Sequence, residues 1–343
     1  MNKAKIVRGE IEVGISPLTF QEDQKTIPFS LPIKRVPEIP TDECLDLADK
    51  IVLITGGSRG IGASACERFV KAGCRVIGTS RYPTRYQKPK NYEMKEMDVR
   101  SDESVKACID AIVADYGHID ILVNNAGIGQ FGRLIKARTE HWIDLFQTNL
   151  FGQHRVTVAA YDHMLRADTR VITIGSLEGS LPVPYMSIYG ISKRALAWWS
   201  MLFALEQRHV KPGPTFSVLE PSYVASTFAD KEQVANYVHT EPDSVDKYVK
   251  LNAIFFPMAI KRGMSPESVA DAIYRIACSK EPRQQYFIDK EHERIIGIGK
   301  SIDELLTLIY TQPIEKTMKL VSEAVEYAVN KYGTLGSLLS LFR

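Results

Sequence analysis

Three side chains between residues 174 and 193 have the types and spacing needed to move a proton: Ser176, Tyr189 and Lys193. Tyr189 and Lys193 are four residues apart, which places both on one face of a helix. A lysine ammonium beside a phenol favours the phenolate, so we expect the pKa of Tyr189 to fall from about 10 towards neutrality. A phenol with such a pKa can exchange a proton with an oxygen atom near neutral pH. The Ser176 hydroxyl would hold that same oxygen. The alternative is that Tyr189 and Lys193 are simply neighbours on a solvent-exposed helix. A catalytic role therefore requires that the rest of the chain place a hydride donor beside them.

The elements that would position these residues alternate regularly from Lys50 onward. Short apolar runs predict strands, and segments with helical periodicity lie between them. Strands rich in Val and Ile, each followed by a helix, are typical of a parallel sheet covered on both faces. We therefore predict an α/β doubly wound parallel sheet, the Rossmann fold, with its ligand crevice at the carboxyl ends of the strands. The predicted strands are Ile51–Thr55, Arg75–Thr79, Ile119–Asn124, Arg170–Gly175, Thr215–Leu219 and Gln285–Ile288, and the predicted helices are 60–72, 102–115, 139–164, 187–209 and 266–278.

The sequence predicts a single catalytic domain, residues 49–290, between two extensions. Prolines recur through residues 1–48, which predicts an extended arm laid over the domain or a partner, or else a disordered segment. Residues 222–265 have weak periodicity and many aromatic side chains, as expected of a lid over a ligand. Residues 291–343 predict a mostly helical tail. Its apolar end, 334–343, would cover the pocket, join a partner or make weak membrane contact.

Charge and cysteine usage exclude several classes of function. The 343 residues include 43 basic and 41 acidic ones, and this balance gives no electrostatic footprint for nucleic acid. The five cysteines are scattered without a CxxC pair, which favours a reducing compartment and argues against a disulfide framework or a zinc site. The first residues lack the apolar run of a signal peptide, and no stretch approaches the roughly 20 apolar residues that span a bilayer. We therefore expect a cytoplasmic protein with no metal and no transmembrane segment.

A glycine-rich turn follows the first strand of the predicted sheet, in the run IVLITGGSRGIG at 51–62. Gly56 permits a tight turn, while Gly60 and Gly62 allow a pyrophosphate and the next helix to approach closely. Amides at the start of that helix favour a negatively charged ligand. The turn therefore predicts dinucleotide binding, with Ser58, Arg59 and Ile61 also beside the cofactor.

The end of the second predicted strand indicates which dinucleotide binds. An NAD site carries an acidic residue there for the ribose 2′-hydroxyl, whereas this chain reads VIGTSR at 76–81 without a carboxylate. Arg59 in the glycine turn and Arg81 after Ser80 suit a 2′-phosphate, which arginine binds as a planar fork. The alternative is two solvated arginines, but their coincidence with the missing carboxylate favours NADP(H).

Taken together, the motifs resemble the short-chain dehydrogenase/reductase family, in its compact single-domain branch. They are TGGSRGIG at 55–62, Asp98-Val99, NNAG at 124–127, Asn149, Ser176, YGISK at 189–193 and PSYVAS at 221–226. The resemblance covers roughly residues 48–280. It implies a catalytic set of Asn149, Ser176, Tyr189 and Lys193. It also implies cofactor contacts, beyond the glycine turn and Ser80-Arg81, from Asp98, Val99, Asn125, Gly127, Tyr189, Lys193, Pro221, Val224 and Ser226.

The resemblance also supplies the roles of the catalytic set. It implies hydride transfer from a nicotinamide to a carbonyl carbon, while Tyr189 protonates the oxygen that Ser176 holds. Lys193 would lower the pKa of Tyr189 and bind the nicotinamide ribose, and Asn149 would hold a water that relays protons from the lysine. Asn149 could equally relieve a helix distortion. Because cytoplasmic NADPH is largely reduced, we expect reduction of a ketone or aldehyde, with alcohol oxidation as the reverse.

The substrate is expected to be lipophilic, because several segments resemble the 17β-hydroxysteroid and retinol dehydrogenase group. Ser176 and Tyr189 would contact it, together with Phe228 of the predicted lid. Glu178, where these relatives usually have a small residue, would bind a polar substrate group or cap the following turn. Alternatives are a reductase of acyl thioester or polyketide ketones and a dinucleotide-sensing regulator without turnover. The family also implies a homodimer or homotetramer.

Overall fold

The computed structural model describes residues 39–40, 44–85, 89–132, 134–183, 186–225 and 263–288, together with three short strands at 6–7, 10–11 and 234–236. The chain divides into two compact units, residues 1–34 and 35–343. In the first unit, β1 (Ile6–Val7) pairs with β2 (Glu10–Ile11) in an antiparallel hairpin. The second unit contains the sheet and every predicted site residue that the structure describes.

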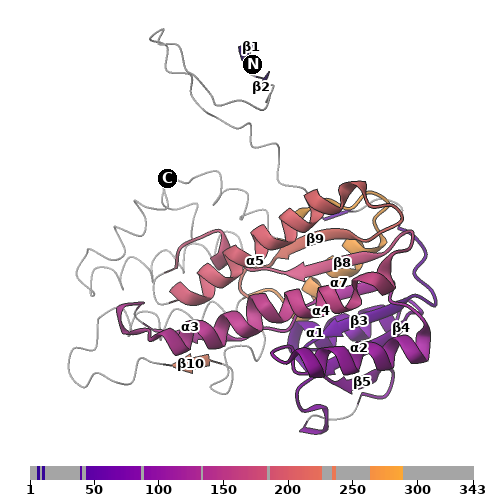
Figure 1. Ribbon diagram of the computed structural model, residues 1–343, viewed down its shortest axis with the longest axis horizontal. Helices are drawn as coiled ribbons and strands as arrows, with labels where there is room; N and C mark the ends of the chain where they lie inside the picture. Colours follow the sequence, from indigo (N-terminus) through magenta and orange to yellow (C-terminus); the bar gives the residue numbers. More distant parts are fainter. Residues whose placement is uncertain are drawn as a thin grey trace, which may run out of the picture. The chain divides into compact units, whose positions relative to one another are not determined.

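A seven-stranded sheet in the order β11-β9-β8-β6-β3-β4-β5 forms the centre of the second unit (Figure 1). Every neighbouring pair is parallel, which confirms the doubly wound Rossmann fold. The central strands are buried along their whole length, as continuous apolar runs require. The strands are β3 (Ile51–Thr55), β4 (Arg75–Ser80), β5 (Glu93–Glu96), β6 (Ile121–Asn124), β8 (Arg170–Ile174), β9 (Thr215–Glu220) and β11 (Gln285–Phe287).

Helices cover both faces of this sheet. The helix α1 (Gly60–Val70) packs against α7 (Pro266–Cys278), and both contribute to one apolar core. A second core lies under α2 (Asp102–Tyr116), α4 (Gly152–Tyr161) and α5 (Ser187–Glu206), which lie side by side across the other face in Figure 1. Local signals set two of the helix starts, because Ser101 caps α2 and Ser265 caps α7 through their side-chain oxygens.

The predicted helix 139–164 is broken into several pieces. It begins as α3 (Thr139–Phe146), widens into the π-helical turn η3 (Gln147–Phe151), continues as α4 and ends in the 3₁₀ turn η4 (Asp162–Met164). A π turn inserts one extra residue into a helix and is frequent at functional sites. Here it carries Asn149, one of the predicted catalytic residues, in a fully buried position.

In the second unit, three of the strands that the structure describes were missed by the sequence prediction. The first, β5, reads EMKE and is only partly buried at the sheet edge, so it lacks the apolar run that marked the others. The other two, β7 (Gly129–Phe131) and β10 (Val234–Asn236), pair with each other in parallel. Since β10 lies within the predicted lid 222–265, at least this part of the lid forms regular structure. The stretches 226–233 and 237–262 lie outside the described residues.

The argument against disulfides was wrong at one pair. Cys44 is bonded to Cys278 at the end of α7, with their Cα atoms 4.8 Å apart. Backbone pairing brings them together, since the Leu45 amide donates to the Cys278 carbonyl at 2.7 Å. A separation of 234 residues gives no local sequence signal for this contact. The remaining cysteines, Cys66, Cys74 and Cys108, are free and buried.

The segment before β3 packs into the domain rather than over it. Leu47 is buried in the core formed with α1 and α7, and Ile39 and Leu45 pack against that core. The tail 291–343, which was predicted to be mostly helical, and most of the predicted arm lie outside the described residues. Among the helices that the structure describes, none is long and apolar enough to cross a membrane.

Candidate active site

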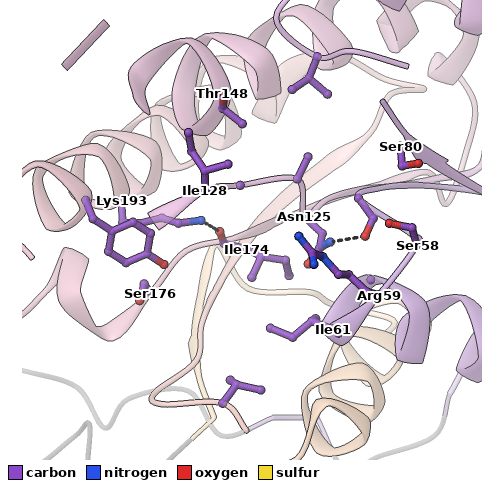
Figure 2. Close-up of a pocket in the computed structure, with 18 of the residues that line it drawn as sticks. Ser58, Arg59, Ile61, Ser80, Asn125, Ile128, Thr148, Ile174, Ser176 and Lys193 are labelled. Atoms are coloured by element: carbon purple, nitrogen blue, oxygen red, sulfur yellow. Dashed lines mark hydrogen bonds between the residues drawn. The ribbon is translucent and has the colours of Figure 1, made fainter. Parts of the chain in front are cut away.

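A cavity of about 240 Å³ lies at the carboxyl ends of the central strands, where the fold predicts a ligand crevice (Figure 2). Its lining combines the glycine turn after β3, the end of β4, the β6 end and the start of α5. The predicted site residues that line it are Gly56, Ser58, Arg59, Gly60, Ile61, Gly62, Ser80, Arg81, Asp98, Val99, Asn125, Gly127, Ser176, Glu178, Tyr189, Lys193, Pro221 and Val224. Of the other three predicted residues, Asn149 is fully buried and does not line the cavity, while Ser226 and Phe228 lie outside the described residues.

The glycine turn is built so that side chains cannot fill it. Gly56 has a φ of 69°, which favours glycine. A Cβ on Gly62 would stand 2.2 Å from the Gly56 carbonyl oxygen and 2.6 Å from Asn125 Nδ2. The same Asn125 amide nitrogen donates to the Thr55 carbonyl oxygen at 2.9 Å and to the Gly56 carbonyl oxygen at 3.3 Å, so Asn125 braces the turn. The backbone therefore offers an open cradle at the start of α1.

The Asn125 segment is fixed from the other side by Thr55, a residue that the sequence analysis did not select. The Thr55 hydroxyl accepts hydrogen bonds from the Asn125 and Ala126 amides, both at 2.9 Å. Thr55 itself is fully buried at the end of β3. Its position as the first residue of the TGGSRGIG motif was the available signal. These contacts assign Asn125 a role in backbone geometry.

The far end of the cavity carries positive and polar groups without a carboxylate at the end of β4. Arg59 and Arg81 line it, and so does Ser80. Within the described part of the chain, Ser80 Oγ is buried and has no hydrogen-bond partner. Because a buried hydroxyl is rarely left unpaired, this atom is available for a ligand. The cradle, the unpartnered hydroxyl and the two guanidinium groups together fit a dinucleotide with a phosphate on its ribose.

Asp98 and Val99 lie at the cavity wall before α2. An Asp98 carboxylate oxygen accepts a hydrogen bond from the Arg100 amide at 3.0 Å. The N-cap of α2 is Ser101, so Asp98 does not cap this helix. Val99 is 6% exposed and packs in the core beneath the cavity, where its side chain would meet a Cβ placed on Gly152. Both residues line the cavity, while their contact with a cofactor stays a prediction.

At the opposite end, β8 and α5 bring the predicted catalytic residues together. Ser176 follows β8, while Tyr189 and Lys193 occupy the first turns of α5, and all three are buried. Lys193 Nζ donates to the Ile174 carbonyl oxygen at 2.8 Å, the contact drawn in Figure 2. Its distance to the centroid of the Tyr189 ring is 5.8 Å. The helix and the strand end therefore place the proton-transfer groups in one cavity with the glycine turn.

The expected lowering of the Tyr189 pKa is not found. Burial raises the pKa of Tyr189 above its usual value, the charge of Glu178 raises it further, and a hydrogen bond with Ser176 acts in the opposite direction. Burial also lowers the pKa of Lys193 to about 8, although the charges of Glu178 and Glu220 oppose that shift. The sequence argument was wrong here because it counted the lysine charge and left out desolvation of the phenol.

Asn149 has a structural role as well as a predicted catalytic one. Its side-chain oxygen accepts from the Ile128 amide at 2.9 Å, and its amide nitrogen donates to the Ile128 carbonyl at 3.0 Å and to Ser192 Oγ at 3.1 Å. These bonds tie the π turn to the segment after β6 and to α5. The distortion that was weighed as its alternative role is therefore present, while the water relay stays a prediction.

Glu178 lies in the short 3₁₀ turn η5 (Leu177–Gly179) and is 8% exposed. Its carboxyl group accepts a hydrogen bond from the Ser176 hydroxyl. This contact differs from a cap on the following turn, which was the preferred alternative. Burial raises the pKa of Glu178, while the Ser176 hydrogen bond and the Lys193 charge lower it less.

Several cavity residues were missed by the sequence analysis. Each lies next to a motif residue in the chain, and this proximity was the only available signal. Ile128 follows the NNAG motif, Thr148 precedes Asn149, and Met186 lies one helical turn before Tyr189. Among the described residues, no group of three His, Cys, Asp or Glu side chains gathers in a way that could hold a metal ion.

The family model for short chain dehydrogenase matches residues 50–237. The chain belongs to this family. It is therefore an oxidoreductase of the short-chain dehydrogenase/reductase type, as the motifs indicated. The matched region includes the glycine turn and all four predicted catalytic residues.

Individual relatives agree with this assignment. The chain is 29% identical to the 3-ketodihydrosphingosine reductase of Bacteroides thetaiotaomicron over 68% of its own length and 85% of the relative. It is 32% identical to the 3-oxoacyl-acyl-carrier-protein reductase of Escherichia coli, over 52% of this chain and 75% of that one. Among solved structures, the ligand-free aldohexose dehydrogenase of Thermoplasma acidophilum superposes with a TM-score of 0.59 at 29% identity, covering 72% of this chain and 95% of that one.

Proposed function

We propose that this short-chain dehydrogenase/reductase uses NADP(H) to reduce a ketone or aldehyde on a lipophilic substrate. The observation that carries the proposal is the joint lining of one cavity by Ser176, Tyr189 and Lys193 and by the glycine turn. Neither group of residues performs the reaction alone. Their common cavity allows a hydride donor and a proton donor to reach one carbonyl group.

The residues proposed to hold the cofactor follow the length of the cavity. The Gly56–Gly62 turn would hold the pyrophosphate at the start of α1, since helix amides attract negative charge. Ser80, Arg59 and Arg81 would bind the 2′-phosphate, and Lys193 the nicotinamide ribose. Asp98, Val99, Gly127, Pro221 and Val224 would complete the lining, with Ser226 as a further predicted contact. When bound, the cofactor supplies the hydride for the carbonyl carbon.

The chain's own contribution is to orient the carbonyl and to supply a proton. Ser176 donates a hydrogen bond to the carbonyl oxygen and stabilises the negative charge that grows there. Tyr189 transfers its phenolic proton to that oxygen, so the carbon–oxygen double bond becomes a single bond to a hydroxyl. Asn149 and Lys193 are proposed to return a proton to Tyr189 from solvent through an ordered water.

The protonation state of Tyr189 is compatible with reduction. A phenol with a raised pKa stays protonated at neutral pH, and the protonated form is the one that a carbonyl reduction consumes. Alcohol oxidation needs the phenolate instead, which the buried site disfavours. We include a cytoplasmic location in the proposal because the cytoplasm keeps its NADPH reduced.

Two substrate classes are supported by the names of relatives. The 3-ketodihydrosphingosine reductase acts, by its name, on a long-chain ketone, which supports the lipophilic class. The 3-oxoacyl-acyl-carrier-protein reductases support the second candidate, a ketone on an acyl thioester. Two basic residues that would suit an acidic carrier, Lys261 and Arg262, lie outside the described residues, as does Phe228. A steroid or retinoid remains a narrower form of the lipophilic proposal.

A substrate panel tests the proposal and separates its two forms. NADPH absorbance is followed with long-chain and steroid ketones, with 3-oxoacyl thioesters and with the matching alcohols plus NADP. We expect oxidation of NADPH by at least one ketone class, and the preferred class identifies the substrate type. NADPH binding without turnover of any compound would favour the third reading, a dinucleotide-sensing regulator.

The cofactor choice predicts an asymmetric effect of Arg81→Ala. Removing one charge-assisted contact to a phosphate costs about 1.5–3 kcal/mol, which corresponds to a loss of roughly 10- to 100-fold in NADPH affinity. NADH lacks the 2′-phosphate, so its affinity should change by less than about twofold. Fluorescence titrations with both cofactors measure the difference, with Arg75→Ala, an exposed arginine at the start of β4, as the control. An equal loss for both cofactors contradicts the 2′-phosphate contact.

An exposed apolar face on α4 and α5 supports the proposed homodimer. Its side chains are between 43% and 53% exposed: Phe151, Val158, Ile191, Trp198, Leu202 and Leu205. Large contiguous apolar patches mark interaction sites, and the His154–Trp199 contact at 3.3 Å holds the two helices side by side. We propose that a second copy of the chain covers this face.

The dimer proposal predicts that Leu202→Glu releases monomers. A charge buried in an apolar interface without a partner is strongly unfavourable, so the mass measured by light scattering should fall to that of one chain. Lys71→Glu is the control and should keep the native mass, because Lys71 is the exposed C-cap of α1, which covers the opposite face of the sheet. An unchanged mass for Leu202→Glu contradicts this choice of interface.

A further inference from the structure

A buried carboxyl group stands beside the hydroxyl that is expected to hold the substrate oxygen. Glu178 is 8% exposed, lines the cavity and accepts a hydrogen bond from Ser176. The family roles given above have no place for a carboxyl group at this position. Burying it without a function costs free energy, because burial disfavours its charged form.

Close packing of η5 on α5 brings Glu178 into this position. A Cβ on Gly190 would stand 2.7 Å from the Glu178 carbonyl oxygen, and a Cβ on Gly179 would stand 3.0 Å from the Lys193 carbonyl carbon. The two glycines therefore let the turn approach the helix that carries Tyr189 and Lys193. The Gly179 amide donates to the Ser176 carbonyl oxygen at 2.9 Å, which ties the turn to the serine.

The protonation state of Glu178 controls what the Ser176 hydroxyl can do. A serine hydroxyl has one hydrogen to donate, and an ionised carboxylate can only accept hydrogen bonds. An ionised Glu178 therefore competes with the substrate for the single Ser176 hydrogen, and its charge makes it the stronger acceptor. A protonated Glu178 can instead donate to Ser176 Oγ, which leaves the Ser176 hydrogen for the substrate oxygen.

We propose that Glu178 is a positioning residue that directs the Ser176 hydroxyl towards the substrate oxygen when it is protonated and away from it when it is ionised. The inference rests on the proposed carbonyl reduction, in which Ser176 donates to the oxygen. Glu178 forms no covalent bond with the substrate. The proton on Glu178 stays on the carboxyl group, and the two hydrogen bonds reorient together. Burial raises the pKa of Glu178, which extends the protonated form to higher pH.

Other charged groups act on this cluster from the elements packed around it. From α5, Lys193 attracts the Glu178 carboxylate and lowers its pKa, and Tyr189 stays protonated. From the end of β9, the buried Glu220 acts on Lys193, while Arg194 lowers the pKa of Glu220. Lys193 has its own titration, with a pKa of about 8. A test must therefore separate the pH dependence that belongs to Glu178 from that of its neighbours.

Glu178→Gln separates them, because an amide N–H can donate to Ser176 Oγ but does not titrate. The measurement is kcat/KM for ketone reduction as a function of pH, from roughly pH 5 to roughly pH 9. In the native protein we expect a loss of about tenfold per pH unit above the pKa of Glu178. In the variant we expect this loss to disappear while activity at low pH stays within a few-fold of native.

Glu220→Gln is the matched control. Glu220 is a second buried carboxyl with a raised pKa, but it accepts hydrogen bonds from Ser180 and Gln285 rather than from Ser176. The Glu220→Gln variant should still lose kcat/KM above the pKa of Glu178, as the native protein does. If Glu178→Gln shows the native pH profile, the inference is overturned while the proposed reduction stands. If the native protein reduces no ketone, the proposed function is overturned and the inference with it.

Thermal unfolding gives a second readout that needs no turnover. The folded-state pKa of Glu178 is raised above its unfolded value, so the native protein should lose stability relative to Glu178→Gln as pH rises between those two values. Below the unfolded pKa of about 4.3 both proteins carry a neutral group at this position, and the pH-dependent difference should vanish. A difference in Tm that does not change with pH contradicts a titrating, buried Glu178 and overturns the inference.

Discussion

Replacing Tyr189 by phenylalanine should reduce ketone turnover by about 10²- to 10⁴-fold, the usual contribution of a positioned general acid. The variant removes one hydroxyl from a side chain that is 7% exposed and keeps the ring. Packing around the start of α5 should therefore persist. Because the phenol acts on the carbonyl oxygen rather than on the cofactor phosphates, NADPH affinity should change little. Steady-state turnover and a fluorescence titration of NADPH measure the two quantities separately.

Tyr161→Phe is the matched control for this variant. Tyr161 ends α4, and its hydroxyl donates to the Gln207 side chain outside the cavity. Its loss removes a tyrosine hydroxyl of similar chemistry and should leave kcat nearly native. A Tyr189→Phe variant that turns over ketone at the native rate would remove the proton donor from the mechanism. A variant that loses NADPH binding as well would assign Tyr189 mainly to the cofactor.

Adding one methyl group at Gly62 should disable the cofactor half of the site. A Cβ there would stand 2.2 Å from the Gly56 carbonyl oxygen, and the nearby backbone cannot move without opening the turn. We expect Gly62→Ala to lower the free energy of unfolding by about 1–3 kcal/mol, as overpacking does. NADPH affinity should fall by about tenfold or more, because the cradle for the pyrophosphate is displaced.

Gly117→Ala controls for the stability loss alone. Gly117 ends α2 with a φ of 80°, and a Cβ there would meet nothing within 4 Å. Its cost should come from the left-handed backbone, about 1–2 kcal/mol. The control should therefore lose similar stability in chemical denaturation and bind NADPH as the native protein does. Equal NADPH affinity in Gly62→Ala and the native protein would contradict the placement of a dinucleotide in this turn.

Patterns that depend on neighbouring residues were predictable from the sequence. The apolar runs at Ile51–Thr55 and Thr215–Leu219 gave strands in the correct places, and the helix 266–278 has the predicted bounds. The glycine turn was predictable for the same reason, since its conformation follows from residues adjacent in the chain. The polar edge strand β5 was not, because its pairing with β4 compensates for a weak apolar pattern.

Properties that arise only when distant segments meet could not be predicted. Cys44 and Cys278 come together through the backbone pairing at the end of α7. The pKa of Tyr189 depends on how deeply α5 is buried and on Glu178, neither of which the YxxxK spacing reveals. Glu178 itself was weighed as a substrate contact or a cap, and its bond to Ser176 required the packing of η5 on α5.

The most direct test of the central claim follows the transferred hydride into the product. The native protein is incubated with a long-chain ketone or a 3-oxoacyl thioester and with NADPH that carries deuterium in place of the transferable hydrogen at C4 of the nicotinamide. Mass spectrometry then measures the alcohol that is formed. We predict an alcohol with one deuterium on the carbinol carbon, formed by the native protein and nearly absent with Tyr189→Phe. Binding of NADPH without any deuterated alcohol would contradict the assignment of this cavity to carbonyl reduction.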